Sequence, residues 1–254
     1  LQDSDLVISV GTPVDGWIEK PLKLVNKTPI AMALVPNVER LALREGGLWE
    51  KKHTHTAKVK VDGHDAEHQH EKPVENRHLD GHIWMSLHNA KQMVKAVSQQ
   101  LQTLQPENQQ AIQQRADDWL RQLDKTNQLI IKRLASVQAE PFLVLHDAFQ
   151  YFEQQYALNG VGSIRLNPEL APSLKRVHEL RERIKSGQVT CLFKEPQFPA
   201  KRVLAVVSGL DVKLGSLDPM GTSYALNKPF MLYDAFLGAL ADQFSDCLAN
   251  KKDH

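Results

Sequence analysis

Short apolar runs alternate with helix-like segments in the second half of the chain. Residues 141–145, 160–166 and 189–193 are such runs, and each precedes a segment whose apolar residues recur at three- and four-residue steps. Strands that alternate with amphipathic helices predict a parallel sheet covered on both faces. Ligands of such sheets bind beyond the carboxyl ends of the strands, so polar residues at those ends are candidates for a site.

The first hundred residues show the same alternation over shorter segments. Residues 5–11 form a β-rich run closed by a glycine, and residues 13–22 predict a helix. The stretch 28–35 is compatible with either a helix or a strand. Residues 82–86 are a short apolar run, and residues 87–104 have the spacing of an amphipathic helix. The whole chain is therefore predicted to be an α/β protein.

One long helical segment separates the two halves. It begins at Pro106 and continues to Val137, with no interior glycine or proline, which predicts a rod of roughly 48 Å. The heptad pattern of a coiled coil is not sustained, so we expect a monomer in which this rigid helix joins two βα lobes. The expected boundaries are 1–105 for the first lobe, 106–138 for the linking helix and 139–254 for the second lobe.

Composition narrows the classes of function. Of 254 residues, 42% are hydrophobic and 24% charged, as in an ordinary globular protein. Lysine and arginine number 31 against 30 acidic residues, with no basic stripe, so nucleic-acid binding is not expected. No apolar run approaches the roughly 18 residues that span a bilayer. The opening residues 1–11 read as the end of a helix leading into a strand, so we expect the N-terminal part of the first lobe to be missing.

Seven of the 11 histidines lie between His53 and His82. Neutral imidazole is a common metal ligand, and a solvated polar insertion is the alternative interpretation of such a loop. The loop, residues 52–80, has no apolar periodicity to order it, so any metal binding should be weak and at several positions. The histidines concerned are His53, His55, His64, His68, His70 and His78.

Three metal-competent side chains stand where predicted strands end. His146 closes the run 142–145, and His82 occupies a similar place beside the short run at 82–86. Asp218 ends the run 212–217. Each of the three has an ordinary structural explanation, and their convergence on one cleft is a hypothesis. The neighbours expected to orient the His146 ring are Asp147, Phe149 and Tyr151.

Motifs of catalysis do not appear. The segment 178–182 lacks the second histidine of a zinc-hydrolase helix, and the chain has neither a phosphate-binding loop nor a GxSxG elbow. We therefore expect a binding protein and not an enzyme. Cys191 and Cys247 belong to no CxxC pair, which argues against a zinc–thiolate site. Buried free thiols and one disulfide both remain compatible with them.

Five blocks of sequence are similar to those of one family. They read GHIWMSLHNA, LHDAFQYFEQQY, NPELAPSLKRVHELRERI, TCLFKEPQF and LDPMGTS, in this order through essentially the whole chain. They resemble the periplasmic zinc-binding proteins of bacterial zinc-uptake ABC transporters, the ZnuA type within the cluster A-I metal solute-binding proteins. The resemblance implies two βα lobes joined by one long rigid helix, with the metal in the cleft between them.

The resemblance also implies ligands. The histidine of the family's H-x-W block corresponds to His82, and that of its HDA block corresponds to His146. Manganese-specific relatives have a glutamate where this chain has His146, and imidazole suits zinc better than manganese. Asp218 matches an aspartate that ligates metal in some relatives and only supports the ligands in others. The family's first histidine ligand lies upstream of the strand that begins here with Asp5.

From these residues we expect a non-catalytic protein that captures zinc in the periplasm with high affinity and delivers it to a membrane permease. The alternatives are a zinc buffer without a transporter, a manganese or iron solute-binding protein, and a zinc hydrolase, which would lack a positioned general base. For an oxidising periplasm we predict a disulfide between Cys191 and Cys247.

Overall fold

The computed structural model describes residues 1–45, 48–49, 79–165, 172–223 and 232–249. Its helices are α1 (Glu19–Leu24), α2 (Leu87–Leu104), α3 (Gln109–Leu134), α4 (Gln150–Tyr156), α5 (Leu174–Lys185), α6 (Lys201–Val207) and α7 (Tyr233–Leu248). Its strands are β1 (Ile8–Ser9), β2 (Ile30–Ala31), β3 (Phe142–His146), β4 (Gly160–Arg165), β5 (Cys191–Lys194) and β6 (Lys213–Ser216). Within the described residues, no helix is long and apolar enough to cross a membrane.

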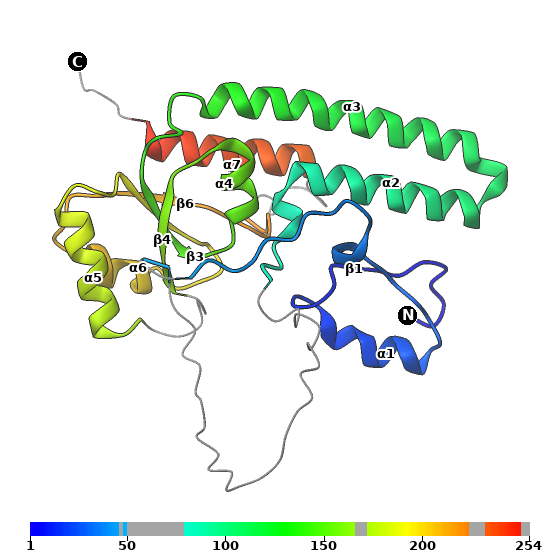
Figure 1. Ribbon diagram of the computed structural model, residues 1–254, viewed down its shortest axis with the longest axis horizontal. Coiled ribbons are helices and arrows are strands. Elements are labelled where there is room, and N and C mark those ends of the chain that lie inside the picture. The colour runs from blue at the N-terminus through cyan, green and yellow to red at the C-terminus, as the bar shows by residue number, and fades with distance from the viewer. Residues whose placement is uncertain (46–47, 50–78, 166–171, 224–231, 250–254) are drawn as a thin grey trace, which may run out of the picture.

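The strands form two parallel sheets (Figure 1). The smaller sheet pairs β1 with β2, and the larger has the strand order β4-β3-β5-β6. Every pair in both sheets is parallel. The predicted α/β class and the predicted parallel sheet are therefore confirmed.

Each face of the larger sheet has its own hydrophobic core, because successive side chains of a strand point to opposite faces. Leu143 and Leu145 of β3 pack in a core with buried residues of α5 and α6. Phe142 and Val144 pack in the second core, with α3, α4 and α7. Helices thus cover both faces, and β3, which is buried on both, lies between its neighbours β4 and β5.

The long helix predicted at 106–137 is confirmed, with different ends. Its first turn, Pro106–Asn108, is a 3-10 helix, and the α-helix α3 ends at Leu134. The 26 residues of α3 span about 39 Å. Figure 1 shows α3 along the top of the molecule, beside α2 at one end and α7 at the other. The division into lobes at 1–105 and 139–254 with a linker at 106–138 stays a prediction.

The expectation that His82 stands at a strand end is wrong. Leu79 forms only an isolated bridge with Ala42, and His82 directly precedes a short 3-10 helix, Ile83–Met85. The chain then turns at once into α2, because the Ser86 hydroxyl caps the helix by accepting a hydrogen bond from the Asn89 backbone N–H at 3.1 Å. This early cap leaves no length for a strand. The undecided stretch 28–35 contains both elements, β2 followed by a 3-10 turn.

Cys191 and Cys247 form a disulfide, as predicted. Cys191 is the first residue of β5 and Cys247 lies in the last turn of α7, with the two Cα atoms 6.0 Å apart. Both residues are buried. The bond therefore ties the last helix to the sheet that it covers.

Candidate metal centre

His146 is held at the carboxyl end of β3 by the carboxylate of Glu195. One oxygen, Oε1, lies 2.6 Å from the His146 Nδ1 atom and accepts the His146 backbone N–H at 3.2 Å. Glu195 directly follows β5, which is parallel to β3, so both residues stand at the same edge of the sheet. Because a carboxylate accepts the hydrogen bond, Nδ1 carries the proton and the lone pair of Nε2 stays free for a metal ion.

His82 has a matching carboxylate in Asp80. Its Oδ1 atom lies 2.7 Å from the His82 Nδ1 atom and accepts the His82 backbone N–H at 3.0 Å. The Asp80 backbone is fixed in turn, because its N–H donates to the Leu41 carbonyl at 2.8 Å and its carbonyl accepts from the Tyr151 hydroxyl at 2.7 Å. Both histidines are thus oriented in the same way. In each case one carboxylate oxygen accepts hydrogen bonds from both the ring Nδ1 and the backbone N–H of the histidine.

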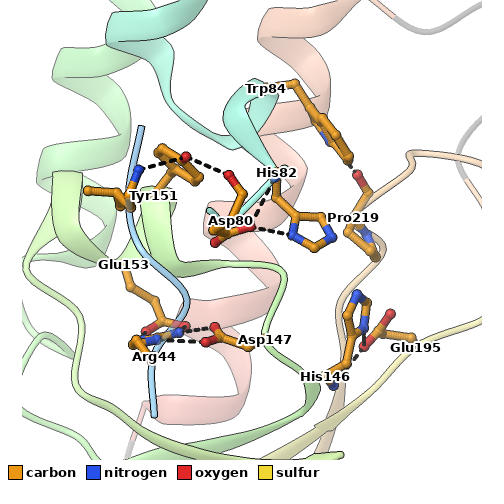
Figure 2. Close-up of polar contacts among 11 residues, drawn as sticks. Arg44, Asp80, His82, Trp84, His146, Asp147, Tyr151, Glu153, Glu195 and Pro219 are labelled. Atoms are coloured by element: carbon orange, nitrogen blue, oxygen red, sulfur yellow. Dashed lines mark hydrogen bonds and ion pairs between the residues drawn. The ribbon is translucent and has the colours of Figure 1, made fainter. Parts of the chain in front are cut away.

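The two imidazoles lie side by side, with ring centroids 5.3 Å apart and ring planes at 61°. Figure 2 shows their Nδ1 sides against Asp80 and Glu195, on the far sides of the pair. A tetrahedral ion bound to both Nε2 atoms at zinc–nitrogen distances of about 2.0–2.1 Å would place the centroids roughly 5 Å apart. The observed spacing therefore suits two ligands of one zinc ion.

Asp218 lies just beyond the carboxyl end of a strand, as predicted. It is two residues after β6 and is fully buried. Its Oδ1 atom accepts from the Gln197 side-chain amide at 2.5 Å and from the Met220 backbone N–H at 3.0 Å. Its Oδ2 atom accepts from the Ser223 backbone and hydroxyl, both at 2.6 Å. Burial acts to raise the pKa of Asp218, but the hydrogen bonds from Ser223, Gln197 and Met220 together hold it below its ordinary value.

The structure therefore joins two of the three predicted metal-competent side chains. His82 and His146 come together, whereas the oxygens of Asp218 are engaged by protein donors. Among the described residues, no group of three or more His, Cys, Asp or Glu side chains is placed to hold a metal ion. The weak sites predicted at His53, His55, His64, His68, His70 and His78 lie outside the described residues.

The three neighbours expected to orient His146 make contacts with other residues. Asp147 pairs with Arg44, and Phe149 is buried with its ring 6.0 Å from that of Phe244. Tyr151 accepts a hydrogen bond from the Leu41 N–H and supports Asp80, and burial raises its pKa to about 12. That expectation is wrong, because the three side chains make these other contacts and Glu195 is the residue that holds the imidazole.

The residues that orient the histidines are absent from our sequence predictions. Asp80 stands two positions before His82, and a short acidic-x-His spacing is a usable signal. Glu195 lies two residues beyond the predicted strand 189–193, which would place it at the same edge as His146 under the strand-end rule. The strand-end rule therefore also identifies Glu195, in the same way as it identifies His146 and Asp218.

A buried ion-pair network lies beside the site (Figure 2). Arg44 Nε donates to Asp147 at 2.9 Å, and the same guanidinium pairs with Glu153. The Trp49 ring lies 3.6 Å from the guanidinium carbon. Burial acts to lower the pKa of Arg44, but the two carboxylates raise it overall, and burial raises the pKa of Glu153. The network fastens the segment around Arg44 to the start of α4, next to His146.

This α/β fold brings two imidazoles together beside the carboxyl end of a parallel sheet. The family model described as "Zinc-uptake complex component A periplasmic", ZnuA, matches residues 1–247. The chain belongs to this family.

Relatives named "High-affinity zinc uptake system protein ZnuA" match the same region. The protein from Yersinia pestis is 31% identical over 252 residues, which cover 98% of this chain and 77% of the relative. The protein from Brucella suis is 29% identical over 264 residues, with 98% and 78% coverage. Both alignments include the residues of the candidate metal centre.

Solved structures share the fold. A crystal structure of ZnuA has a TM-score of 0.73 and 20% identity, and the alignment covers 98% of this chain and 81% of the other. The periplasmic zinc-binding protein TroA from Treponema pallidum has a TM-score of 0.71 and 20% identity, with 98% and 82% coverage. At this identity the likeness establishes the architecture.

Proposed function

We propose that this protein binds zinc through the Nε2 atoms of His82 and His146 and delivers it to the permease of an ABC transporter in the periplasm. The observation that carries the proposal is the pair of imidazoles 5.3 Å apart, each with Nδ1 against a buried carboxylate. The names of the relatives, which are high-affinity zinc uptake proteins, support the choice of cargo. No chemical step is involved, so the protein is a carrier and not an enzyme.

The surroundings of the imidazoles favour a divalent cation. Hydrogen bonds from Nδ1 to Asp80 and Glu195 set the tautomer and make Nε2 a better donor to the metal. The second carboxylate oxygens, Asp80 Oδ2 and Glu195 Oε2, are buried and have no hydrogen-bond partner in the part of the chain that the structure describes. Their negative charge is therefore poorly compensated without a cation, and imidazole selects zinc over manganese.

The proposed carrier has two lobes with the metal between them. His82 precedes α2 in the first lobe, 1–105, and His146 ends β3 in the second lobe, 139–254, while α3 within 106–138 links the two. The near balance of 31 basic and 30 acidic residues argues against nucleic-acid binding. A monomer is expected because the long helix does not sustain the heptad pattern of a coiled coil. A transport carrier and a free zinc buffer can be distinguished by measuring zinc uptake by cells. Uptake by the proposed route should require both this protein and the permease, whereas a buffer would not need the permease.

Metal titration tests the proposal. The metal-stripped protein, titrated with zinc against a competing chromophoric chelator, should show one tight equivalent, and manganese should compete poorly for it because two of the ligands are imidazoles. The exposed His178, on α5, provides a control, because His178→Ala should leave this equivalent unchanged. Manganese bound as tightly as zinc, or no tight equivalent, would contradict the proposal.

We also propose that the six histidines between residues 53 and 78 bind further zinc weakly and raise its local concentration near the tight site. Deleting residues 52–75 removes five of these six histidines, all but His78, and should abolish the weak equivalents. The tight equivalent should stay nearly intact, because His82 lies outside the deletion. Calorimetric zinc titration of the two forms measures both classes. Loss of the tight equivalent from a folded deletion protein would show that the loop supplies a primary ligand.

A further inference from the structure

We propose that Trp84 is a positioning residue for zinc capture, and that Asp218 acts on His82 through Trp84 instead of binding the metal. The inference rests on the proposed role of His82 as a zinc ligand. The residues belong to two segments that are far apart in the sequence. The loop at residues 218–223 contacts the turn that follows His82.

The Trp84 indole contacts both the histidine and the loop. Its ring meets the His82 ring edge-on, with centroids 5.2 Å apart and an angle of 61°. Its Nε1–H donates to the Pro219 carbonyl at 2.9 Å (Figure 2). The His82 imidazole is therefore set by Asp80 at Nδ1 and by the Trp84 ring beside it, and the position of the indole is set by the loop.

The backbone of Trp84 is held from the same side of the molecule. The Tyr233 hydroxyl, in the first turn of α7, donates to the Trp84 carbonyl at 2.7 Å. Trp84 is thus attached to the C-terminal part of the chain at both its carbonyl and its indole. A displacement of the loop or of α7 would move the edge against which His82 rests.

Asp218 organises the loop that presents the Pro219 carbonyl. Its two oxygens receive the backbone N–H groups of Met220 and Ser223, in addition to side-chain donors. Coordination of a metal ion would compete with these bonds for the same lone pairs. Because Pro219 is the next residue in the chain, the turn around Asp218 determines where its carbonyl lies, and so Asp218 reaches His82 without contacting the metal.

An apolar cavity of about 500 Å³ makes the hydrogen bond to Pro219 important. It borders Trp84 and is lined also by Val10, Val14, Met220, Gly221 and Phe236. Among the described residues, packing on that side of the indole is therefore incomplete, which leaves room for the ring. The Nε1–H bond is the directional contact that keeps the indole against His82.

A double-mutant cycle tests the inference. Trp84→Phe keeps an aromatic ring and removes the Nε1–H donor, and Asp218→Asn keeps the size of the side chain and removes its charge. Each should weaken zinc binding roughly fivefold, as expected for one lost hydrogen bond. The double variant should bind zinc about as well as the weaker single variant, because both changes break one chain of contacts. Trp17→Phe, at a tryptophan that is 73% exposed, is the matched control.

Bound cobalt(II) gives a second readout, because its absorption spectrum responds to the geometry of the ligands and not to a general loss of stability. Trp84→Phe and Asp218→Asn should alter this spectrum in the same way. Additive losses in the cycle would show that Trp84 and Asp218 act independently, which would overturn the inference. A spectral change confined to Asp218→Asn would indicate that Asp218 is a ligand and would also overturn it. Unchanged affinity and spectrum in Trp84→Phe would overturn it as well.

Ser223→Ala serves if Asp218→Asn does not fold, since it removes only the hydroxyl bond to Asp218 and should also be non-additive with Trp84→Phe. Failure of the underlying function would look different. If His82→Ala binds zinc normally, the proposed site itself is wrong, whereas loss of zinc in His82→Ala together with a neutral Trp84→Phe contradicts only the inference.

Discussion

Alanine at either His82 or His146 should weaken zinc binding far beyond the tenfold that about 1.4 kcal/mol represents. Each substitution removes one imidazole of the pair whose rings lie 5.3 Å apart. It also leaves a carboxylate, Asp80 or Glu195, buried without its Nδ1 partner, which lowers the stability of the metal-free fold. The loss of zinc affinity comes from the missing Nε2 ligand.

Competitive titration of metal-stripped variants measures the loss, with His178→Ala as the control for removal of an exposed histidine on α5. Glu195→Gln tests the contribution of the carboxylate charge with both histidines kept, because an amide oxygen still accepts the Nδ1–H hydrogen bond while the charge is gone. Its loss should be smaller, within the roughly 10- to 100-fold range of residues that support a ligand. Unchanged zinc affinity in either alanine variant would remove that histidine from the site.

Replacing both Cys191 and Cys247 with alanine should lower the free energy of unfolding by roughly 4 kcal/mol in the chain-entropy model. The two cysteines are 56 positions apart, so the disulfide closes a long loop of the unfolded chain. Alanine is preferred to serine because both positions are buried and a hydroxyl would lack a solvent partner.

Urea unfolding of the oxidised protein and of the variant measures this difference, and the reduced wild-type protein is the matched control. Zinc affinity should change little, because Cys191 begins β5 whereas Glu195 follows its other end. Equal midpoints for oxidised and reduced protein would show that the disulfide does not stabilise the fold.

Local sequence patterns were sufficient for most elements of the larger sheet. The apolar run Phe142–Leu145 has no polar residue to expose, which predicts a strand buried on both faces, and β3 is such a strand. Pro106 marks the start of the long helix because proline lacks the N–H that a first turn leaves unpaired. Where the pattern was short, as at residues 82–86, a 3-10 turn formed instead of a strand.

The site was predicted less completely. His82 and His146 were singled out as strand-end candidates, and the family resemblance then matched both to ligand positions. The disulfide required the compartment as well as the residues, since two isolated cysteines are compatible with free thiols. Asp218 was placed at the correct edge, but the donors that occupy its oxygens come from Gln197 and from the turn after it.

The amino-acid order alone settled the α/β class, the long helix and the strand that ends in His146, because these depend on periodicities within a few turns or residues of chain. The contacts between side chains that are distant in the sequence were decided by the tertiary structure. The Nδ1 atom of His146 meets a carboxylate 49 positions away, and the indole of Trp84 meets a carbonyl 135 positions away. Such contacts depend on the order β4-β3-β5-β6 and on the path of the loop after β6, and no local pattern encodes either. The proposed ligand residues could therefore be named from sequence, whereas the groups that orient them became visible only when distant segments were brought together.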